Sequence, residues 1–97
     1  MTIRDDLIAR IKNVAPELRE HSVQAVWLFG SVARNQATVA SDVDVLVEFS
    51  GPVTIFEFIR LRRRLEAVLG RTVDLVTREA LKPQLRDRIL SEAVRAA

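Results

Sequence analysis

The spacing of apolar residues changes several times along the chain, and each change predicts a new element. Near the N-terminus apolar residues recur every three or four positions, which predicts an amphipathic helix that ends near Pro16. The residues on its apolar side are Ile3, Leu7, Ile8, Ile11 and Val14. A continuous apolar run at residues 25–29 ends at Gly30, which predicts a buried strand and then a tight turn. A short helix is expected to begin within residues 31–35.

Residues 41–49 carry the clearest strand signal. Valines alternate there with other residues, so that successive side chains should point to opposite faces of a sheet. One face would hold Val43, Val45, Val47 and Phe49, and the other Asp42, Asp44, Leu46 and Glu48. Residues 50–52, which read Ser-Gly-Pro, then break the strand.

The second half of the chain predicts two further helices and one strand. Thr54 followed by Glu57 has the form of a capping box, so a helix should run from there to about Leu69 and stop at Gly70. Its residues expected to face the core are Ile55, Phe58, Ile59, Leu65 and Leu69. Residues 72–76 predict a third short strand, and Pro83 suits the first turn of a last helix. The apolar side of that helix is expected to hold Leu85, Ile89, Leu90 and Val94.

The predicted order is helix, strand, short helix, strand, long helix, strand, helix. This order indicates the α/β (α+β) class, with a small mixed β-sheet covered by helices. At 97 residues the chain has room for one core, so we expect a single domain over residues 1–97. The 48% apolar and 29% charged content is typical of a globular protein.

The amino-acid composition limits which metal ligands are possible and where in the cell the protein is expected. Without cysteine, neither disulfides nor thiolate metal sites can form, so any metal must be bound by oxygen ligands or by His21. No stretch of about 18 apolar residues and no signal-like N-terminus is present. We therefore expect a cytoplasmic protein with no membrane contact, and we expect His21 to be an exposed loop residue.

The charge pattern does not by itself argue for a nucleic-acid interface. The net charge is only +2, and the densest basic cluster, Arg60–Arg64, lies on a predicted helix whose other side is apolar. Such a cluster is usually a solvated face. The chain has no tyrosine, and Trp27 and Phe29 are interpreted as core residues because they belong to the apolar run. Few aromatic side chains therefore remain to stack on bases, and direct nucleic-acid binding is not expected.

Two aspartates on one strand are the first candidates for chemistry. Asp42 and Asp44 should project their carboxylates to the same face, where like charges repel and need a cation to neutralise them. Magnesium suits this arrangement, because it binds a few carboxylates together with waters and substrate phosphates. Upstream, Gly30 and Ser31 lie at a strand-to-helix turn, where a phosphate can approach backbone N–H groups and the serine hydroxyl.

Asp74 is a third candidate carboxylate. It lies within an otherwise apolar strand, where a buried carboxylate needs a partner or a metal. Three carboxylates from two neighbouring strands would hold two magnesium ions. Alternatively, Asp74 forms a structural ion pair with Arg71 or Arg78.

These stretches together resemble the signature of the DNA polymerase β-like nucleotidyltransferase superfamily. The matching segments are residues 28–34 (LFGSVAR) and residues 41–49 (SDVDVLVEF), followed by residues 73–76 (VDLV) and 81–89 (LKPQLRDRI). Within the superfamily the chain is most similar to the minimal nucleotidyltransferases of bacteria and archaea. The glycine usual after the motif arginine is replaced by Asn35, which tolerates left-handed backbone geometry.

The resemblance implies a polymerase β-like fold and a metal-dependent reaction. A nucleoside monophosphate would pass from a magnesium-bound nucleoside triphosphate to an acceptor hydroxyl. Asp42 and Asp44 would bind both of two Mg²⁺ ions, and Asp74 would complete the catalytic metal site.

The same resemblance assigns nucleotide-binding residues. Gly30 and Ser31 would hold the triphosphate of ATP. Arg34 would approach the phosphates or brace the carboxylates. Lys82 fits the pattern of the C-terminal segment, but neither the pattern nor the chemistry assigns it a role.

Three functions are compatible with this pattern. The first, which the resemblance favours, is a protein adenylyltransferase, the antitoxin of a toxin–antitoxin pair, that transfers AMP to a tyrosine hydroxyl of a HEPN-domain toxin and forms a hetero-oligomer with it. The second is a small-molecule nucleotidyltransferase of the aminoglycoside-modifying type. The third is a non-catalytic antitoxin that neutralises its partner by binding. The short chain favours an acceptor brought by a protein partner, because it leaves little surface for a closed acceptor pocket.

Overall fold

The computed structural model describes residues 1–97. In chain order the elements are α1 (Ile3–Asn13), α2 (Ala15–Glu20), β1 (Val23–Phe29), α3 (Gly30–Ala33), β2 (Val43–Phe49), α4 (Ile55–Leu69), β3 (Val73–Thr77), the 3₁₀ helix η1 (Arg78–Ala80), α5 (Pro83–Glu92) and β4 (Val94–Arg95). All seven predicted elements are present. Helix α2, the short helix η1 and strand β4 were not predicted.

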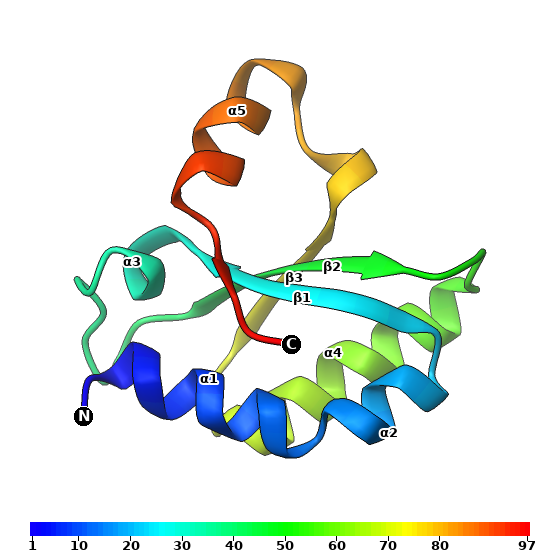
Figure 1. The fold of residues 1–97 in the computed structure, drawn as a ribbon, viewed down its shortest axis with the longest axis horizontal. Helices are drawn as coiled ribbons and strands as arrows, with labels where there is room; N and C mark the ends of the chain where they lie inside the picture. The colour runs from blue at the N-terminus through cyan, green and yellow to red at the C-terminus, as the bar shows by residue number, and fades with distance from the viewer.

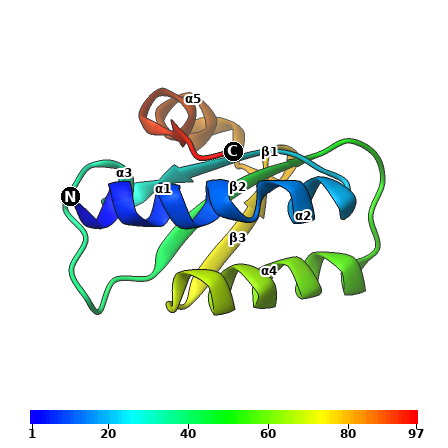
Figure 2. The same cartoon turned by 60° about the horizontal axis from the view of Figure 1, so that its bottom comes forward.

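Four strands form one mixed sheet in the order β3-β2-β1-β4. Strand β1 is antiparallel to β2 and β4, whereas β2 and β3 are parallel. In Figure 1, helices α1, α2 and α4 lie below the sheet and α5 lies above it. Figure 2 shows the same layers from a tilted view. The predicted small mixed sheet covered by helices is confirmed, and none of the helices is long and apolar enough to cross a membrane.

The main core lies between the sheet and the helices α1, α2 and α4. It contains 16 buried residues, including Val43, Val45 and Val47 of β2 and Leu65 of α4, all 0% exposed. Each such side chain contributes about 1.5–3 kcal/mol on burial. The predicted alternation along β2 is therefore confirmed, because its valines face this core.

Helix α4 begins and ends where the sequence predicts. Thr54 Oγ1 accepts a hydrogen bond from the Glu57 amide, and Glu57 Oε1 accepts one from the Thr54 amide, both at 3.2 Å. Gly70 ends the helix in the left-handed conformation, with φ +66°. The expectation that Ile55 faces the core is wrong, since this residue is 65% exposed. It is the first residue of α4, six positions before Leu61, the first buried residue of the helix, so it lies at the helix end beyond the buried stripe.

The two ends of the chain differ from the prediction. The first helix ends at Asn13, and a new helix begins at Ala15 with Pro16 in its first turn, where proline is tolerated because no amide hydrogen is needed. At the other end, α5 stops at Glu92, so Val94 does not continue its apolar side. Val94 belongs to β4, where pairing with the edge of β1 satisfies backbone groups that would otherwise be open.

Candidate active site

Side chains line up in rows across the face of the sheet that is turned away from α1, α2 and α4. Strand register pairs Phe29 of β1 with Asp44 of β2, and Asp44 with Asp74 of β3. The neighbouring row consists of Trp27, Leu46 and Val76. Because alternate residues share a face, Asp44 and Asp74 lie side by side on adjacent strands, next to an apolar row.

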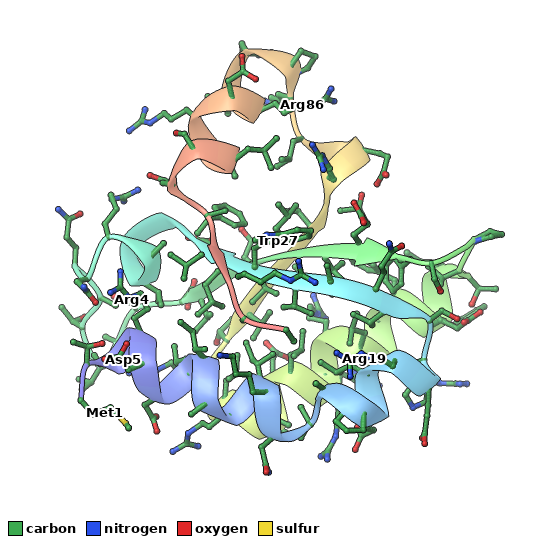
Figure 3. The ribbon with its side chains drawn as sticks, viewed as in Figure 1. Met1, Arg4, Asp5, Arg19, Trp27 and Arg86 are labelled. Atoms are coloured by element: carbon green, nitrogen blue, oxygen red, sulfur yellow. The ribbon has the colours of Figure 1, made fainter.

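The aromatic residues of β1 belong to this second face and not to the main core. Trp27 and Phe29 are half-buried and lie outside the 16-residue core cluster, so their interpretation as core residues is wrong. The reason is strand alternation, since Val26 and Leu28 take the inward positions. The Arg95 guanidinium lies over the Trp27 ring, 5.3 Å from its centroid. Figure 3 shows Trp27 between the sheet and α5, which carries Arg86.

Gly30 and Asp44 approach each other closely at the end of β1. Gly30 has φ +69°, in the left-handed region, and begins α3 as the predicted tight turn requires. A Cβ atom at this position would lie 2.1 Å from Asp44 Oδ2. The carboxylate therefore fills the space that any other residue's side chain would need, and only glycine fits. Ser31, half-buried, follows in the first turn of α3.

Asp44 carries negative charge that the fold does not fully compensate. Burial raises the pKa of its carboxyl above the ordinary value, and the charges of Asp74 and Asp42 raise the pKa further. Glu92 acts in the same direction, whereas the Arg34 guanidinium opposes the rise. A carboxylate held among like charges in this way is typical of functional sites.

Asp42 lies directly before β2, at the end of a loop that is held by an arginine. It is exposed. The sequence pattern placed it within the strand, whereas the strand begins only at Val43. Arg71 Nη1 donates hydrogen bonds to the backbone oxygens of Thr38, at 2.8 Å, and Ser41, at 3.3 Å. These contacts hold the loop that leads into Asp42.

Asp74 is exposed on the edge strand β3, so the expectation that it is buried is wrong. The proposed ion pair with Arg71 or Arg78 is also wrong. Arg71 binds backbone oxygens, and Arg78 Nη1 lies 3.8 Å from Glu48 Oε2. The exposure arises because the second face of the sheet is open at this edge, which leaves the Asp74 carboxylate accessible.

The carboxylates fit magnesium that arrives together with a nucleotide. No group of three acidic or histidine side chains is close enough to form a complete metal site by itself. Asp44 nevertheless has Asp42 and Asp74 close enough to repel its charge. Because Mg²⁺ takes one or two carboxylates and completes its octahedron with waters and substrate phosphates, this donor set suits it.

Arg34 contacts a carboxylate that the sequence analysis missed. Its Nη1 donates to both oxygens of Glu92, at 3.2 and 3.1 Å, and its Nε donates to Gln36 Oε1 at 3.0 Å. One signal pointed to Glu92: an acidic residue in the last turn of a helix with no basic residue there opposes the helix dipole. The next residue after Arg34, Asn35, has φ +58°, as its tolerance of left-handed geometry predicts.

The remaining candidates lie away from the carboxylates. Arg64 of the basic cluster pairs with Glu17 of α2 at 2.6 Å, and this hydrogen bond lowers the pKa of Glu17. The larger of two surface hollows lies between α2 and α4 and is lined by Glu17, Leu18, His21, Glu57, Arg60, Leu61 and Arg64. His21 is exposed, as predicted. Lys82 is the N-cap residue of α5 and its side chain makes no capping hydrogen bond.

Known proteins resemble this chain along most of its length. A relative from Methanocaldococcus jannaschii, provisionally named a protein adenylyltransferase, is 43% identical over 86% of this chain and 89% of its own. The protein adenylyltransferase MntA of Thermococcus cleftensis is 43% identical over 80% of each chain.

Solved structures share the fold. One described provisionally as a minimal nucleotidyltransferase is 39% identical, with a TM-score of 0.82, and the match covers 97% of this chain and 95% of that one. The MNT antitoxin in complex with the tri-AMPylated HEPN toxin of Shewanella oneidensis matches at 19% identity, with a TM-score of 0.67 over 94% of this chain and 71% of that one. At such low identity this likeness concerns the fold alone. The nucleotidyltransferase domain family matches residues 10–96, and the chain belongs to that family.

Proposed function

We propose that this chain is a magnesium-dependent protein adenylyltransferase, an antitoxin that transfers AMP from ATP to a tyrosine hydroxyl of a HEPN-domain toxin. One observation carries the proposal: the Asp44 carboxylate lies against the Gly30 turn and beside Asp74, with negative charge that needs a cation. The names of two relatives at 43% identity support the protein acceptor. We expect the reaction to take place in the cytoplasm, where ATP and magnesium are available.

In an in-line substitution at phosphorus, the carboxylates and the Gly30 turn would have different roles. Asp42, Asp44 and Asp74 would hold two magnesium ions, which neutralise phosphate charge and make the acceptor hydroxyl more acidic. Gly30 provides the space for close approach, and Ser31 offers its hydroxyl and amide to the triphosphate.

The reaction has a simple balance of atoms. The tyrosine oxygen forms a bond to the α-phosphorus, the bond from that phosphorus to the bridging oxygen breaks, and pyrophosphate leaves. The hydroxyl proton passes to a carboxylate or to water. Because there is little covalent chemistry for the protein, positioning and charge stabilisation supply most of the catalysis.

The open position of the carboxylates supports a macromolecular acceptor. Asp42 and Asp74 are exposed, so a partner that docks on this face of the sheet can bring a tyrosine to them. Such docking also raises the effective concentration of the hydroxyl at the site. We expect a stable hetero-oligomer between this chain and the helical toxin.

Intact-mass spectrometry of the co-expressed pair tests the proposal. After incubation with ATP and magnesium, the toxin should gain the mass of one or more AMP groups, and chelation of the metal should abolish the gain. Two other outcomes would replace the proposal. AMP found on a small molecule such as an aminoglycoside, with an unmodified toxin, would indicate the small-molecule enzyme. A toxin that is inhibited but unmodified, even with Asp42→Asn and Asp44→Asn combined, would indicate a binding antitoxin.

A further inference from the structure

The last strand of the chain places an acidic residue directly opposite the Gly30 turn. In the antiparallel pair of β1 and β4, Trp27 faces Arg95 and Leu28 faces Val94. Two residues before Val94, Glu92 ends α5, and two residues after Leu28, Gly30 begins α3. Backbone hydrogen bonds continue the pairing in the other direction, because the Ala96 amide donates to the Val26 oxygen at 2.8 Å. The C-terminal segment is therefore anchored along β1, and this anchoring determines where Glu92 lies.

The Glu92 carboxylate contacts two groups of the proposed nucleotide site. Its Oε1 accepts a hydrogen bond from the Gly30 amide at 3.2 Å. Both of its oxygens accept from Arg34 Nη1, at 3.2 and 3.1 Å. The Glu92 side chain is only 21% exposed, whereas that of Arg34 is 42% exposed, so the carboxylate is the more enclosed member of the pair.

The surroundings of Glu92 are otherwise unfavourable for a negative charge. It is the last residue of α5, where the helix dipole is negative, and no basic residue lies in that turn. It also lies near enough to Asp44 for their charges to interact. Arg34 and the Gly30 amide are the groups that compensate for this placement. Because this carboxylate does not favour the end of α5, its contacts with Arg34 and the Gly30 amide are its main structural effect.

We propose that Glu92 is a positioning residue of the nucleotide site. It holds the Gly30 turn against Asp44 and directs the Arg34 guanidinium, so that α5 and β4 become part of the site although they are distant in sequence. Nη1 of the guanidinium binds Glu92 and Nε binds Gln36, so Nη2 stays available to phosphate oxygens. The inference rests on the proposed roles of Gly30 and Arg34 in nucleotide binding. Holding the arginine in advance reduces the entropy lost when the triphosphate binds.

Binding of a non-hydrolysable ATP analogue in the presence of magnesium tests this role without any acceptor. Glu92→Ala should weaken binding of the analogue about tenfold, as expected when a charged hydrogen-bonding group loses its orientation. Glu92→Gln should give a smaller loss, because the amide oxygen still accepts one hydrogen bond. In an Arg34→Ala background, Glu92→Ala should cost less than in the wild type, since only its contact with the Gly30 amide is left to lose.

A matched control and an independent readout separate positioning from a general structural role. Glu20→Ala, at an exposed glutamate of α2 outside the ion pairs, should leave analogue binding unchanged. The chain has only three glycines, so the Gly30 amide can be followed in a nitrogen–proton NMR spectrum with Gly70 as reference. Glu92→Gln should shift the Gly30 resonance and leave that of Gly70 in place.

Unchanged or tighter analogue binding in both Glu92 variants would overturn the inference, because it would mean that Glu92 competes with the triphosphate or only stabilises α5. The inference would also be overturned if Glu92→Ala weakened analogue binding by the same factor with Arg34 present and with Arg34 replaced by Ala. If Glu92→Ala does not fold, the glutamine variant alone decides by the binding and NMR readouts. Failure of wild-type protein to label the toxin, with these binding results as expected, would reject the protein acceptor and leave the role of Glu92 standing.

Discussion

The helix-covered face of the sheet and the face turned toward α5 are built from alternate residues of the same strands. Along β2, Val43 and Val45 are 0% exposed and belong to the main core, whereas Asp44 between them is only half-buried and repels its acidic neighbours. Along β3, buried Val73 and Leu75 flank exposed Asp74 in the same way. Strand alternation therefore lets one segment supply stability on one side and chemistry on the other. Substitutions on the two faces should accordingly have separable effects.

The largest effect is expected on the charged face. Replacing Asp42 and Asp44 together by Asn should reduce transfer of AMP to background, because the proposed metal ligands are removed. The melting temperature of the metal-free protein should not fall, since repulsion between carboxylates is removed as well. Labelling of the toxin from radiolabelled ATP, combined with thermal melting, measures both. Labelling at the wild-type rate would show that the site lies elsewhere.

The opposite pattern is expected on the helix-covered side. Leu65→Ala should lower the free energy of unfolding by about 2–5 kcal/mol, because it leaves a cavity at a fully buried position. Urea denaturation measures the change. The same substitution at Leu85, which is 43% exposed, is the matched control and should cost less than about 1 kcal/mol. Equal losses at the two positions would contradict the assignment of the main core.

A smaller loss of activity, again without loss of stability, is expected at Asp74. Asp74→Asn should reduce transfer about a hundredfold, equivalent to about 2.7 kcal/mol of transition-state stabilisation. It should barely change the melting temperature, because the Asp74 side chain is exposed and its candidate ion-pair partners are engaged elsewhere. Kinetics and melting of the same preparation are compared. A lower melting temperature with full activity would mean that Asp74 is structural.

The smallest effect concerns the pH dependence of stability. The pKa of Asp44 is raised in the folded protein, so the folded state favours the protonated carboxyl. The contribution of this group to stability is present below the ordinary pKa of aspartate and is lost as the pH rises through the raised value. Asp44→Asn should therefore give a small stabilisation of the metal-free protein at neutral pH, which disappears in acid. A stabilisation that does not change with pH would argue against this electrostatic origin.

The parts of the fold that could be predicted from the sequence depend on local chemistry. The capping box at Thr54 and the stop at Gly70 set the ends of α4, and both were found as expected. The alternation of residues along β2 was enough to predict that its valines and Asp44 lie on opposite faces of the sheet. Where a local signal has two meanings, the prediction was incomplete: the first helix ends near Pro16, at Asn13, but helix α2 was not predicted. Pro16 was interpreted as the end of a helix, although it also suits the first turn of the next one.

The sequence by itself determined seven of the ten elements, the separation of the two sheet faces and the residue types of the candidate site, because these depend on spacing within a few residues. Only the tertiary structure decided which residues meet. Strand β4 has two residues, too few for any periodicity, and yet its pairing with β1 brings Glu92 to Gly30 across 62 positions of the sequence. The exposure of Asp74 likewise depends on β3 being an edge strand. Such facts follow from packing between distant segments, and no local pattern encodes them.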